Sequence, residues 1–385
     1  MPRIKNMPLT DPVAILAELI KMPSVTPNQA GTIDYIEKII QKIGGQIKRI
    51  DSNDTANLLA TIGTGKKILA FAGHVDVVPS GSHDKWLNDS PFELQKRNDE
   101  LIGRGVVDMK GAIAAFLSAL IDFSHKASPD DYQIMLIITS DEEGPATDGT
   151  IKIVEKLQQE KIQLDYCIIG EPTSSKVFGD TIKVGRRGSL TGELTIFGKQ
   201  GHIAYPDLCI NPIHKSLAAL NELVQVKWDE GNQHFPPTSL QFANLNAGLG
   251  VTNVIPGQLS TNFNFRYNTV HDADSLITQT ENILNKYQLQ YTINWKHSAK
   301  PFLTKVAGLV DIATQAVQEI CNITPELKTD GGTSDGRFLI DISNELIEIG
   351  LLNATAHQIN ETTTVNDLKQ LTAVYNSILH KAFYG

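Results

Sequence analysis

The chain has 385 residues and a formal net charge of −9 at neutral pH. One hydrophobic core rarely serves more than roughly 250–300 residues, so we expect two domains. The acidic balance argues against a nucleic-acid partner, and no apolar run approaches the ~20 residues of a membrane span. The basic start, residues 1–8, is followed by no apolar secretory core, and the three cysteines form no Cys-x-x-Cys pair. We therefore expect a cytoplasmic protein with no signal peptide and no thiolate zinc site.

Helices and strands are predicted to alternate in the first part of the chain. Apolar residues at helical spacing predict helices over residues 12–21, 32–43, 112–125 and 150–161. Short apolar runs predict strands over residues 58–62, 68–72, 134–139 and 166–169. The run 134–139 is continuously apolar, which is typical of a strand buried on both faces. This alternation predicts an α/β domain with a mainly parallel sheet flanked by helices.

The pattern changes near residue 183. Strands that alternate apolar and polar residues are predicted over 190–197, 239–244, 259–267 and 291–297, with helices over 211–226 and 272–287. Two strand–helix–strand units of this kind predict a ferredoxin-like α+β domain. A long helix is predicted over 303–321 and a closing helix over 366–383. We therefore expect a catalytic domain of residues 1–183 and 300–385, interrupted by an inserted domain of residues 184–299.

Three acidic residues, Asp141, Glu142 and Glu143, follow the most apolar predicted strand. Ligands of open α/β sheets bind beyond the carboxyl ends of the strands, so a binding site is expected here. Adjacent carboxylates repel each other unless a positive group holds them. A metal ion could hold one and leave the other free as a base, although a solvated acidic turn would show the same pattern.

Four further segments carry residues that can bind metals. His74 and Glu171 follow predicted strands, Asp108 precedes a predicted helix, and His357 lies near the C-terminus. Asp76, two residues after His74, could orient the histidine ring. A polar strand end, a helix cap, a turn and a surface histidine are the ordinary alternatives. Together, however, these residues form the ligand set of a carboxylate-bridged metal pair, and histidine with carboxylate suits zinc, with manganese or cobalt as replacements.

These segments resemble the M20 family of dinuclear zinc peptidases and deacylases. The resemblance rests on Gly73–Asp76, Gly105–Gly111, Ser140–Gly144, Gly170–Pro172 and His357. Finer matches, at residues 185–189, 201–206, 228–232, 235–238, 253–257, 331–338 and 352–355, set the chain apart from the acetylornithine deacetylases and aminoacylases of the family. The likeness spans nearly the whole chain from Val13 onward. A short extra N-terminus before Leu9 is the only departure.

The resemblance implies amide hydrolysis with two zinc ions per chain. It assigns His74 and Glu171 to one ion, Glu143 and His357 to the other, and Asp108 to a bridging position between them. Glu142 would then be the general base and acid. The resemblance also implies a homodimer formed through the inserted domain, in which His202 reaches the partner's site and steadies the oxyanion.

The implied substrate is small and strongly anionic, so its binding residues should be basic or should donate hydrogen bonds. The candidates are Arg186, Arg266, Asn253, Asn353 and the main-chain N–H groups of Thr333 and Ser334. Guanidinium groups match carboxylates in a bidentate fork, and successive N–H groups of a glycine-rich turn can bind an anion. Ordinary surface salt bridges are the alternative for the arginines.

Three rival functions remain open at this point. Residues 332–336 match the Gly-x-Ser-x-Gly pattern of a nucleophile elbow, so a serine hydrolase could use Ser334 with His357. This alternative leaves four candidate ligands without a role, namely His74, Asp108, Glu143 and Glu171. A non-catalytic zinc-binding or scaffold protein would not need a free acid at Glu142. Within the family, an N-acetyl-amino-acid deacylase such as acetylornithine deacetylase is the nearest rival.

Overall fold

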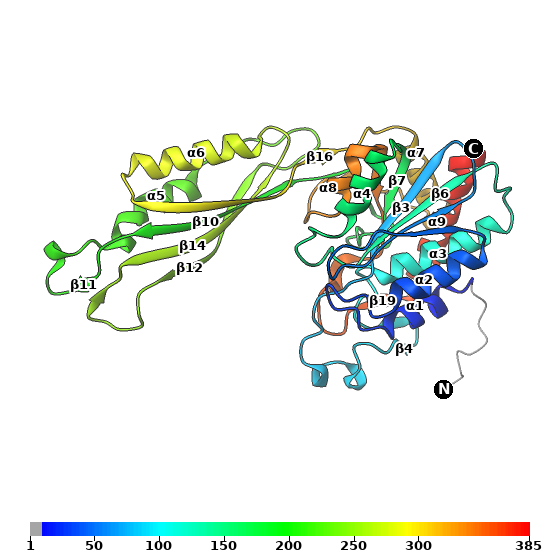
Figure 1. Ribbon diagram of the computed structural model, residues 1–385, viewed down its shortest axis with the longest axis horizontal. Helices are drawn as coiled ribbons and strands as arrows, with labels where there is room; N and C mark the ends of the chain where they lie inside the picture. The colour runs from blue at the N-terminus through cyan, green and yellow to red at the C-terminus, as the bar shows by residue number, and fades with distance from the viewer. Residues whose placement is uncertain (1–9) are drawn as a thin grey trace. The chain divides into compact units, whose positions relative to one another are not determined.

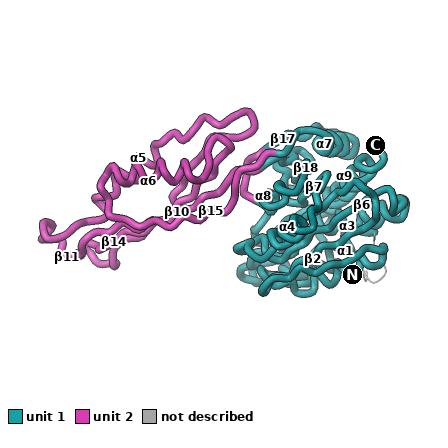
Figure 2. The backbone as a smooth tube through the Cα atoms, turned by 45° about the horizontal axis from the view of Figure 1, so that its top comes forward, with its two compact units in different colours: residues 1–185, 304–328, 334–385 teal, residues 186–303, 329–333 magenta. Residues whose placement is uncertain are grey.

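The computed structural model describes residues 10–385, so the extra N-terminus before Leu9 lies outside the described residues. The chain forms two compact units (Figure 2). Unit 1 comprises the residues up to 185 together with 304–328 and 334–385, and unit 2 comprises 186–303 and 329–333. The chain passes from unit 1 to unit 2 after residue 185 and returns to unit 1 at residue 304. Both boundaries lie within a few residues of those expected from the sequence. The sequence did not predict that 329–333 joins unit 2.

An eight-stranded sheet forms the centre of unit 1. Its strands, in spatial order, are β1 (Gln46–Arg49), β2 (Asn57–Ile62), β6 (Gln133–Thr139), β3 (Ile68–His74), β7 (Leu164–Ile169), β18 (Ser343–Glu348), β8 (Thr181–Lys183) and β17 (Glu326–Lys328). Figure 1 labels β6, β3 and β7 of this sheet. The four central strands, β6, β3, β7 and β18, run parallel to one another. All residues of β3 and β6 except the first are buried, as expected for strands covered on both faces.

Seven α-helices of the described chain belong to unit 1. They are α1 (Pro12–Ile20), α2 (Thr32–Lys42), α3 (Lys110–Ser124), α4 (Thr150–Gln159), α7 (Gly308–Cys321), α8 (Gly336–Leu339) and α9 (Val365–Tyr384). Helices α1, α3, α7 and α9 pack against one another, while α2 and α4 pack on the strands β1, β2 and β6. A second, three-stranded sheet contains β4 (Gln95–Arg97), β5 (Glu100–Ile102) and β19 (Thr362–Thr364) in the order β19, β5, β4. The predicted α/β architecture of this unit is confirmed.

In the last third of the chain, one expectation was wrong and one strand was missed. The helix predicted from residue 303 begins only at Gly308, because β16 (Phe302–Leu303) pairs with β9 (Gly185–Arg186) and the Thr304 N–H donates to the Val184 carbonyl. Strand β18 was not predicted at all, although it lies in the parallel centre of the sheet. Its apolar run is short and ends in Glu348, an acid that is fully buried and accepts a hydrogen bond from the Ser334 hydroxyl.

Unit 2 contains a four-stranded antiparallel sheet and two helices. The elements follow the chain order β10 (Gly188–Phe197), α5 (Pro212–Gln225), β12 (Ser239–Ala247), β14 (Gln258–Tyr267), α6 (Ala273–Lys286) and β15 (Tyr291–Ala299). The strands lie in the order β12, β14, β10, β15. This βαββαβ connection with the first and third strands in the middle is the predicted ferredoxin-like arrangement. Alternate residues of β14 are buried, because one face of the sheet packs on α5 and α6.

The cysteines differ in exposure. Cys167, on β7, has no exposed surface, whereas Cys209 in unit 2 and Cys321 at the end of α7 are partly exposed. None of the three forms a disulfide. Among residues 10–385, no helix has both the length and the apolar character needed to cross a membrane.

Candidate metal centre

The parallel strands of unit 1 bring the predicted metal-binding segments to one edge of the sheet. Strands β3, β6 and β7 are neighbours and run in the same direction, so their carboxyl ends meet. His74 is the last residue of β3, Glu142 and Glu143 follow β6, and Glu171 follows β7. Asp108 lies in the loop before α3. His357 follows the short helix η6 (Asn353–Thr355).

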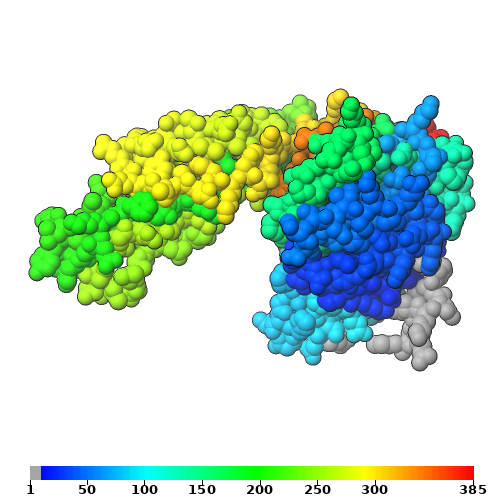
Figure 3. Space-filling model, in the orientation of Figure 1, coloured from blue at the N-terminus to red at the C-terminus, as the bar shows by residue number. Residues whose placement is uncertain are grey.

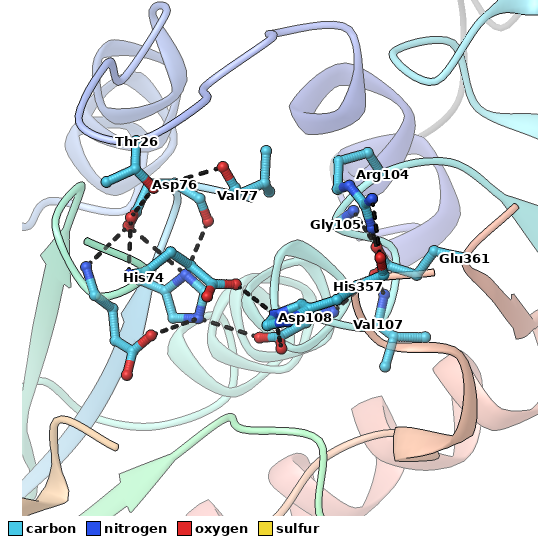
Figure 4. Close-up of polar contacts among 12 residues, drawn as sticks. Thr26, His74, Asp76, Val77, Arg104, Gly105, Val107, Asp108, His357 and Glu361 are labelled. Carbon is cyan, nitrogen blue, oxygen red and sulfur yellow. Dashed lines mark hydrogen bonds and ion pairs between the residues drawn. The ribbon is translucent and has the colours of Figure 1, made fainter. Parts of the chain in front are cut away.

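Asp108 lies between the two histidines (Figure 4). Its Oδ1 is 3.2 Å from Nε2 of His74, and its Oδ2 is 3.2 Å from Nε2 of His357. Each histidine has a second acid beside it: Glu171 Oε1 lies 3.6 Å from Nε2 of His74, and Glu143 Oε1 lies 2.8 Å from Nε2 of His357. The carboxylate therefore presents one oxygen to each of two histidine–glutamate pairs, which is the geometry expected of a bridging ligand.

Glu142 lies beside this arrangement. Its Oε2 is 4.0 Å from Nε2 of His74, farther than the nearest oxygens of Asp108 and Glu171. His74, Glu142 and Glu171 nevertheless form one group whose ligand atoms lie within 4.8 Å of one another, and His74, Asp108 and Glu143 form a second such group. Glu142 is thus close enough to exchange a proton with a molecule held at the centre.

The cluster concentrates negative charge where water has little access. Burial raises the pKa of Glu142 to about 8; the charge of His74 opposes this shift, while Asp335, Glu143 and Asp108 add to it. Burial, followed by the charges of Asp108 and Glu142, holds the pKa of Glu171 well above its usual range. A divalent cation relieves this repulsion directly, and imidazole nitrogen with carboxylate oxygen is a donor set that zinc accepts. The described residues therefore fit a metal pair.

Asp76 acts differently from the sequence expectation. Nδ1 of His74 lies 2.9 Å from the main-chain oxygen of Asp76 and 3.7 Å from its carboxylate, so the carbonyl holds the ring. The carboxylate accepts hydrogen bonds instead from the Thr26 hydroxyl at 2.7 Å and from the main-chain N–H groups of Glu142 and Glu143 at 3.3 and 3.1 Å. Asp76 therefore orients a histidine with its main chain and the acidic loop with its side chain.

Arginines cluster in unit 2, and one of them was missed in the sequence. Arg186 donates to the carbonyl oxygens of Asp330 and Gly332, and Arg187 donates to that of Gly331. Burial, and then the positive charge of Arg187, lower the pKa of Arg266. The NH1 group of Arg266 is buried and has no hydrogen-bond partner among the described residues. Two guanidinium groups that repel each other favour an anion between them. The only sequence signal for Arg187 is its position directly after Arg186.

Ser334 does not form a nucleophilic pair. Its hydroxyl is fully buried and donates to the Glu348 carboxylate, while the His357 ring contacts Asp108 and Glu143. The serine-hydrolase alternative is therefore wrong.

Four predicted residues remain, three of them in unit 2 and one in unit 1. Thr333 is the last residue of its segment in unit 2, Asn253 and His202 are exposed in unit 2, and Asn353 is exposed at the start of η6. Nδ1 of His202 accepts a hydrogen bond from the Ala204 N–H at 3.0 Å. Their roles stay predictions.

Comparison with known proteins decides the family. Residues 70–381 match the sequence model of peptidase family M20/M25/M40. The chain belongs to this family. It is 49% identical to a succinyl-diaminopimelate desuccinylase of Thiobacillus denitrificans, covering 97% of this chain and 95% of that protein. Proteins with the same name from Nitrosospira multiformis and Coxiella burnetii are 47% and 46% identical, each over 95% of this chain and over 97% and 98% of their own lengths.

Solved structures of the M20 family share this fold. An M20 family metallo-carboxypeptidase of Sulfolobus solfataricus superposes with a TM-score of 0.80 at 19% identity, covering 96% of this chain and 98% of the other. A dinuclear metal-binding M20 peptidase of Bacillus subtilis superposes with a TM-score of 0.71 at 14% identity, covering 97% and 99%. Both units of the chain therefore have counterparts in the M20 fold.

We predict that Asp76→Asn lowers kcat by about 10–100-fold, the range typical of outer-shell partners of metal ligands. An amide has a single acceptor oxygen, so its NH₂ end would face an N–H of Glu142 or Glu143. Thr26→Val is the matched control, because it removes one donor to Asp76 and leaves both main-chain contacts in place. Steady-state kinetics with metal analysis would measure both variants. An unchanged kcat in Asp76→Asn would contradict the role given to its carboxylate.

Proposed function

We propose that the chain hydrolyses the amide bond of N-succinyl-LL-2,6-diaminoheptanedioate and releases succinate and LL-2,6-diaminoheptanedioate. The observation that carries this proposal is the Asp108 carboxylate placed between two histidine–glutamate pairs. It occurs in a chain that is 46–49% identical, over nearly its whole length, to proteins named succinyl-diaminopimelate desuccinylase. The enzyme is a metal-dependent amidohydrolase, and its reaction would serve diaminopimelate and lysine biosynthesis.

Two zinc ions, which cobalt or manganese could replace, are the proposed cofactors. His74 and Glu171 would hold one ion, Glu143 and His357 would hold the other, and Asp108 would bridge them. When bound, such a pair supplies Lewis-acid activation of water and of the amide carbonyl. The crowding of buried carboxylates around two imidazoles supports this assignment.

Glu142 moves the protons in the proposed mechanism. It accepts a proton from the attacking water and returns it to the nitrogen of the leaving amine. Its main-chain N–H donates to the Asp76 carboxylate, so the loop that carries Glu142 is held in place before the substrate arrives. Because the His74 Nδ1 faces the main-chain oxygen of Asp76, that nitrogen carries the ring proton and Nε2 is left as the ligand atom.

The substrate carries three carboxylates, and the arginines of unit 2 are its proposed partners. Arg186 and Arg266 were expected in this role, and the repulsion between Arg187 and Arg266 adds Arg187 to it. Further hydrogen bonds would come from Asn253, Asn353 and the main-chain N–H groups of Thr333 and Ser334. Charge-assisted hydrogen bonds of this type are roughly twice as strong as neutral ones, so they suit an anionic substrate.

A homodimer formed through unit 2 is the proposed assembly, in the cytoplasm. Strands β12 and β15 are the edges of its sheet, and an exposed edge can pair with another chain. The segment after β11 (Gly201–His202) exposes Ile203, Tyr205 and Leu208 at 55%, 62% and 67%, and it lies at one end of unit 2 (Figure 3). Large apolar side chains that are exposed together in one segment favour a protein interface there.

The direct test is succinate release from N-succinyl-LL-2,6-diaminoheptanedioate, with N-acetylornithine assayed in parallel. We expect activity on the succinyl substrate, loss of that activity after treatment with a chelator, and recovery when Zn²⁺ or Co²⁺ is added back. Preferential cleavage of N-acetylornithine would replace the proposed substrate. Activity that survives complete metal removal would contradict the metal-dependent mechanism.

We predict that Glu142→Gln lowers kcat by about 10²–10⁴-fold, because it removes the proton carrier. Metal content should stay close to that of the unchanged chain, since Glu142 is not assigned as a ligand. Glu143→Gln is the matched control and should lose metal. If Glu142→Gln loses an ion while Glu143→Gln keeps both, the roles of the two neighbouring acids are reversed.

We predict that His202 acts on the active site of the partner subunit. His202→Ala homodimers and Glu142→Gln homodimers should each be nearly inactive. In a mixed dimer, purified with two different affinity tags, one site combines an intact Glu142 with an intact His202 from the other subunit. That site should work, so activity should return to about half of the unchanged value if the two sites are independent. Mixed dimers that stay inactive would show that His202 serves its own chain.

A further inference from the structure

A buried ion pair lies beside the metal centre and belongs to neither its ligands nor its base. Arg104 is 2% exposed and Glu361 is fully buried, and NH1 of Arg104 lies 2.7 Å from Oε2 of Glu361. Burying two charges carries a desolvation cost that their attraction offsets only in part. Such a pair contributes little net stability to the fold. Its role therefore lies in the hydrogen bonds that each partner makes with the main chain.

Glu361 binds the loop that carries Asp108. Its Oε1 accepts hydrogen bonds from the N–H groups of Val107 at 2.8 Å and Asp108 at 3.0 Å, and its Oε2 accepts one from Gly105 at 3.0 Å (Figure 4). Gly105 adopts φ +86°, and a side chain there would meet Val77 at 2.8 Å. The carboxylate therefore fixes three main-chain groups of a tight loop.

Arg104 binds the loop that carries His357. NH2 donates to the carbonyl oxygen of His357 at 3.3 Å and to that of Pro79 at 3.4 Å, and NH1 donates to that of Gln358 at 3.2 Å. His357 has φ +64°, in the left-handed region that residues other than glycine seldom adopt. The guanidinium also lies 5.1 Å from the centre of the Trp86 ring, which limits its movement. Arg104 thus holds an unfavourable backbone conformation at a proposed ligand.

We propose that Arg104 and Glu361 are positioning residues of the metal centre. The ion pair joins the loop of Asp108 to the loop of His357, and so sets the distance between the bridging carboxylate and the second histidine. Without it, the Asp108 oxygens would not stay aligned with both imidazoles, at the 3.2 Å that separates each pair. This inference rests on the proposed function only in taking Asp108 and His357 as metal ligands.

The test is the binding of Co²⁺ to the metal-free full-length chain. Calorimetry measures the affinity, and the visible absorption of bound Co²⁺ reports the geometry of the site. In Glu361→Gln, one end of the side chain turns from acceptor to donor and faces N–H groups, so we expect Co²⁺ affinity to fall by about 10–100-fold. In Arg104→Lys, the ion pair can persist, but a single nitrogen cannot replace the fork that spans the carbonyls of Pro79, His357 and Gln358. We expect that variant to weaken one Co²⁺ more than the other and to change the absorption bands.

Glu345→Gln is the matched control, because Glu345 also accepts a main-chain hydrogen bond in unit 1, from Leu309 at 2.7 Å. It should bind Co²⁺ within about twofold of the unchanged chain. Circular dichroism of the metal-free forms checks folding, and Arg104→Lys carries the test if Glu361→Gln does not fold. Unchanged Co²⁺ affinity and absorption in a folded Arg104→Lys or Glu361→Gln chain would overturn the proposal, as would an equal loss in Glu345→Gln. These readouts need no substrate, so a failure of succinate release would refute the proposed reaction alone.

Discussion

Repulsion among buried carboxylates is the constraint on which the centre of unit 1 depends. The parallel strands and the loop before α3 bring Asp108, Glu142, Glu143 and Glu171 to one edge, where burial raises the pKa of Glu142 and of Glu171. Two imidazoles relieve part of the repulsion, and a divalent cation would relieve more. The loops at this edge are held by contacts outside the cluster, with the Asp76 carboxylate on one side and the Arg104–Glu361 pair on the other. The fold thereby keeps like charges together before any cation binds.

The sequence pointed to the proposed ligands because several weak signals occur together in one α/β layer, although each signal alone has an ordinary explanation. His74, Glu143 and Glu171 follow apolar strands, and parallel strands must end at a common edge. The same reasoning missed β18, because acids at Glu345 and Glu348 interrupt its apolar run. A buried carboxylate in a central strand has no signature in one sequence, since the Ser334 hydroxyl that accompanies it lies fourteen residues earlier.

The supporting residues were hidden for a similar reason. Arg104 and Glu361 are 257 positions apart, and each reads as an ordinary surface charge until folding buries them together. The sequence placed Asp76 near His74 but could not tell which of its oxygens would reach the ring. Only the folded chain shows that the main-chain oxygen of Asp76 faces His74. It also shows that Arg187 is a neighbour of Arg266. The division into two units could be predicted from the sequence. Near residue 183 the predicted strands change from continuously apolar runs to alternating apolar and polar residues.

The three cysteines provide natural attachment sites for labels in both units of the chain. Burial raises the pKa of the Cys167 thiol to about 12, so this residue offers almost no thiolate to a labelling reagent. Cys209 and Cys321 are partly exposed and lie one in each unit. A pair of fluorescent or spin labels attached to the natural sequence would therefore report the separation of the two units in solution, with and without substrate, and would require no engineered cysteine.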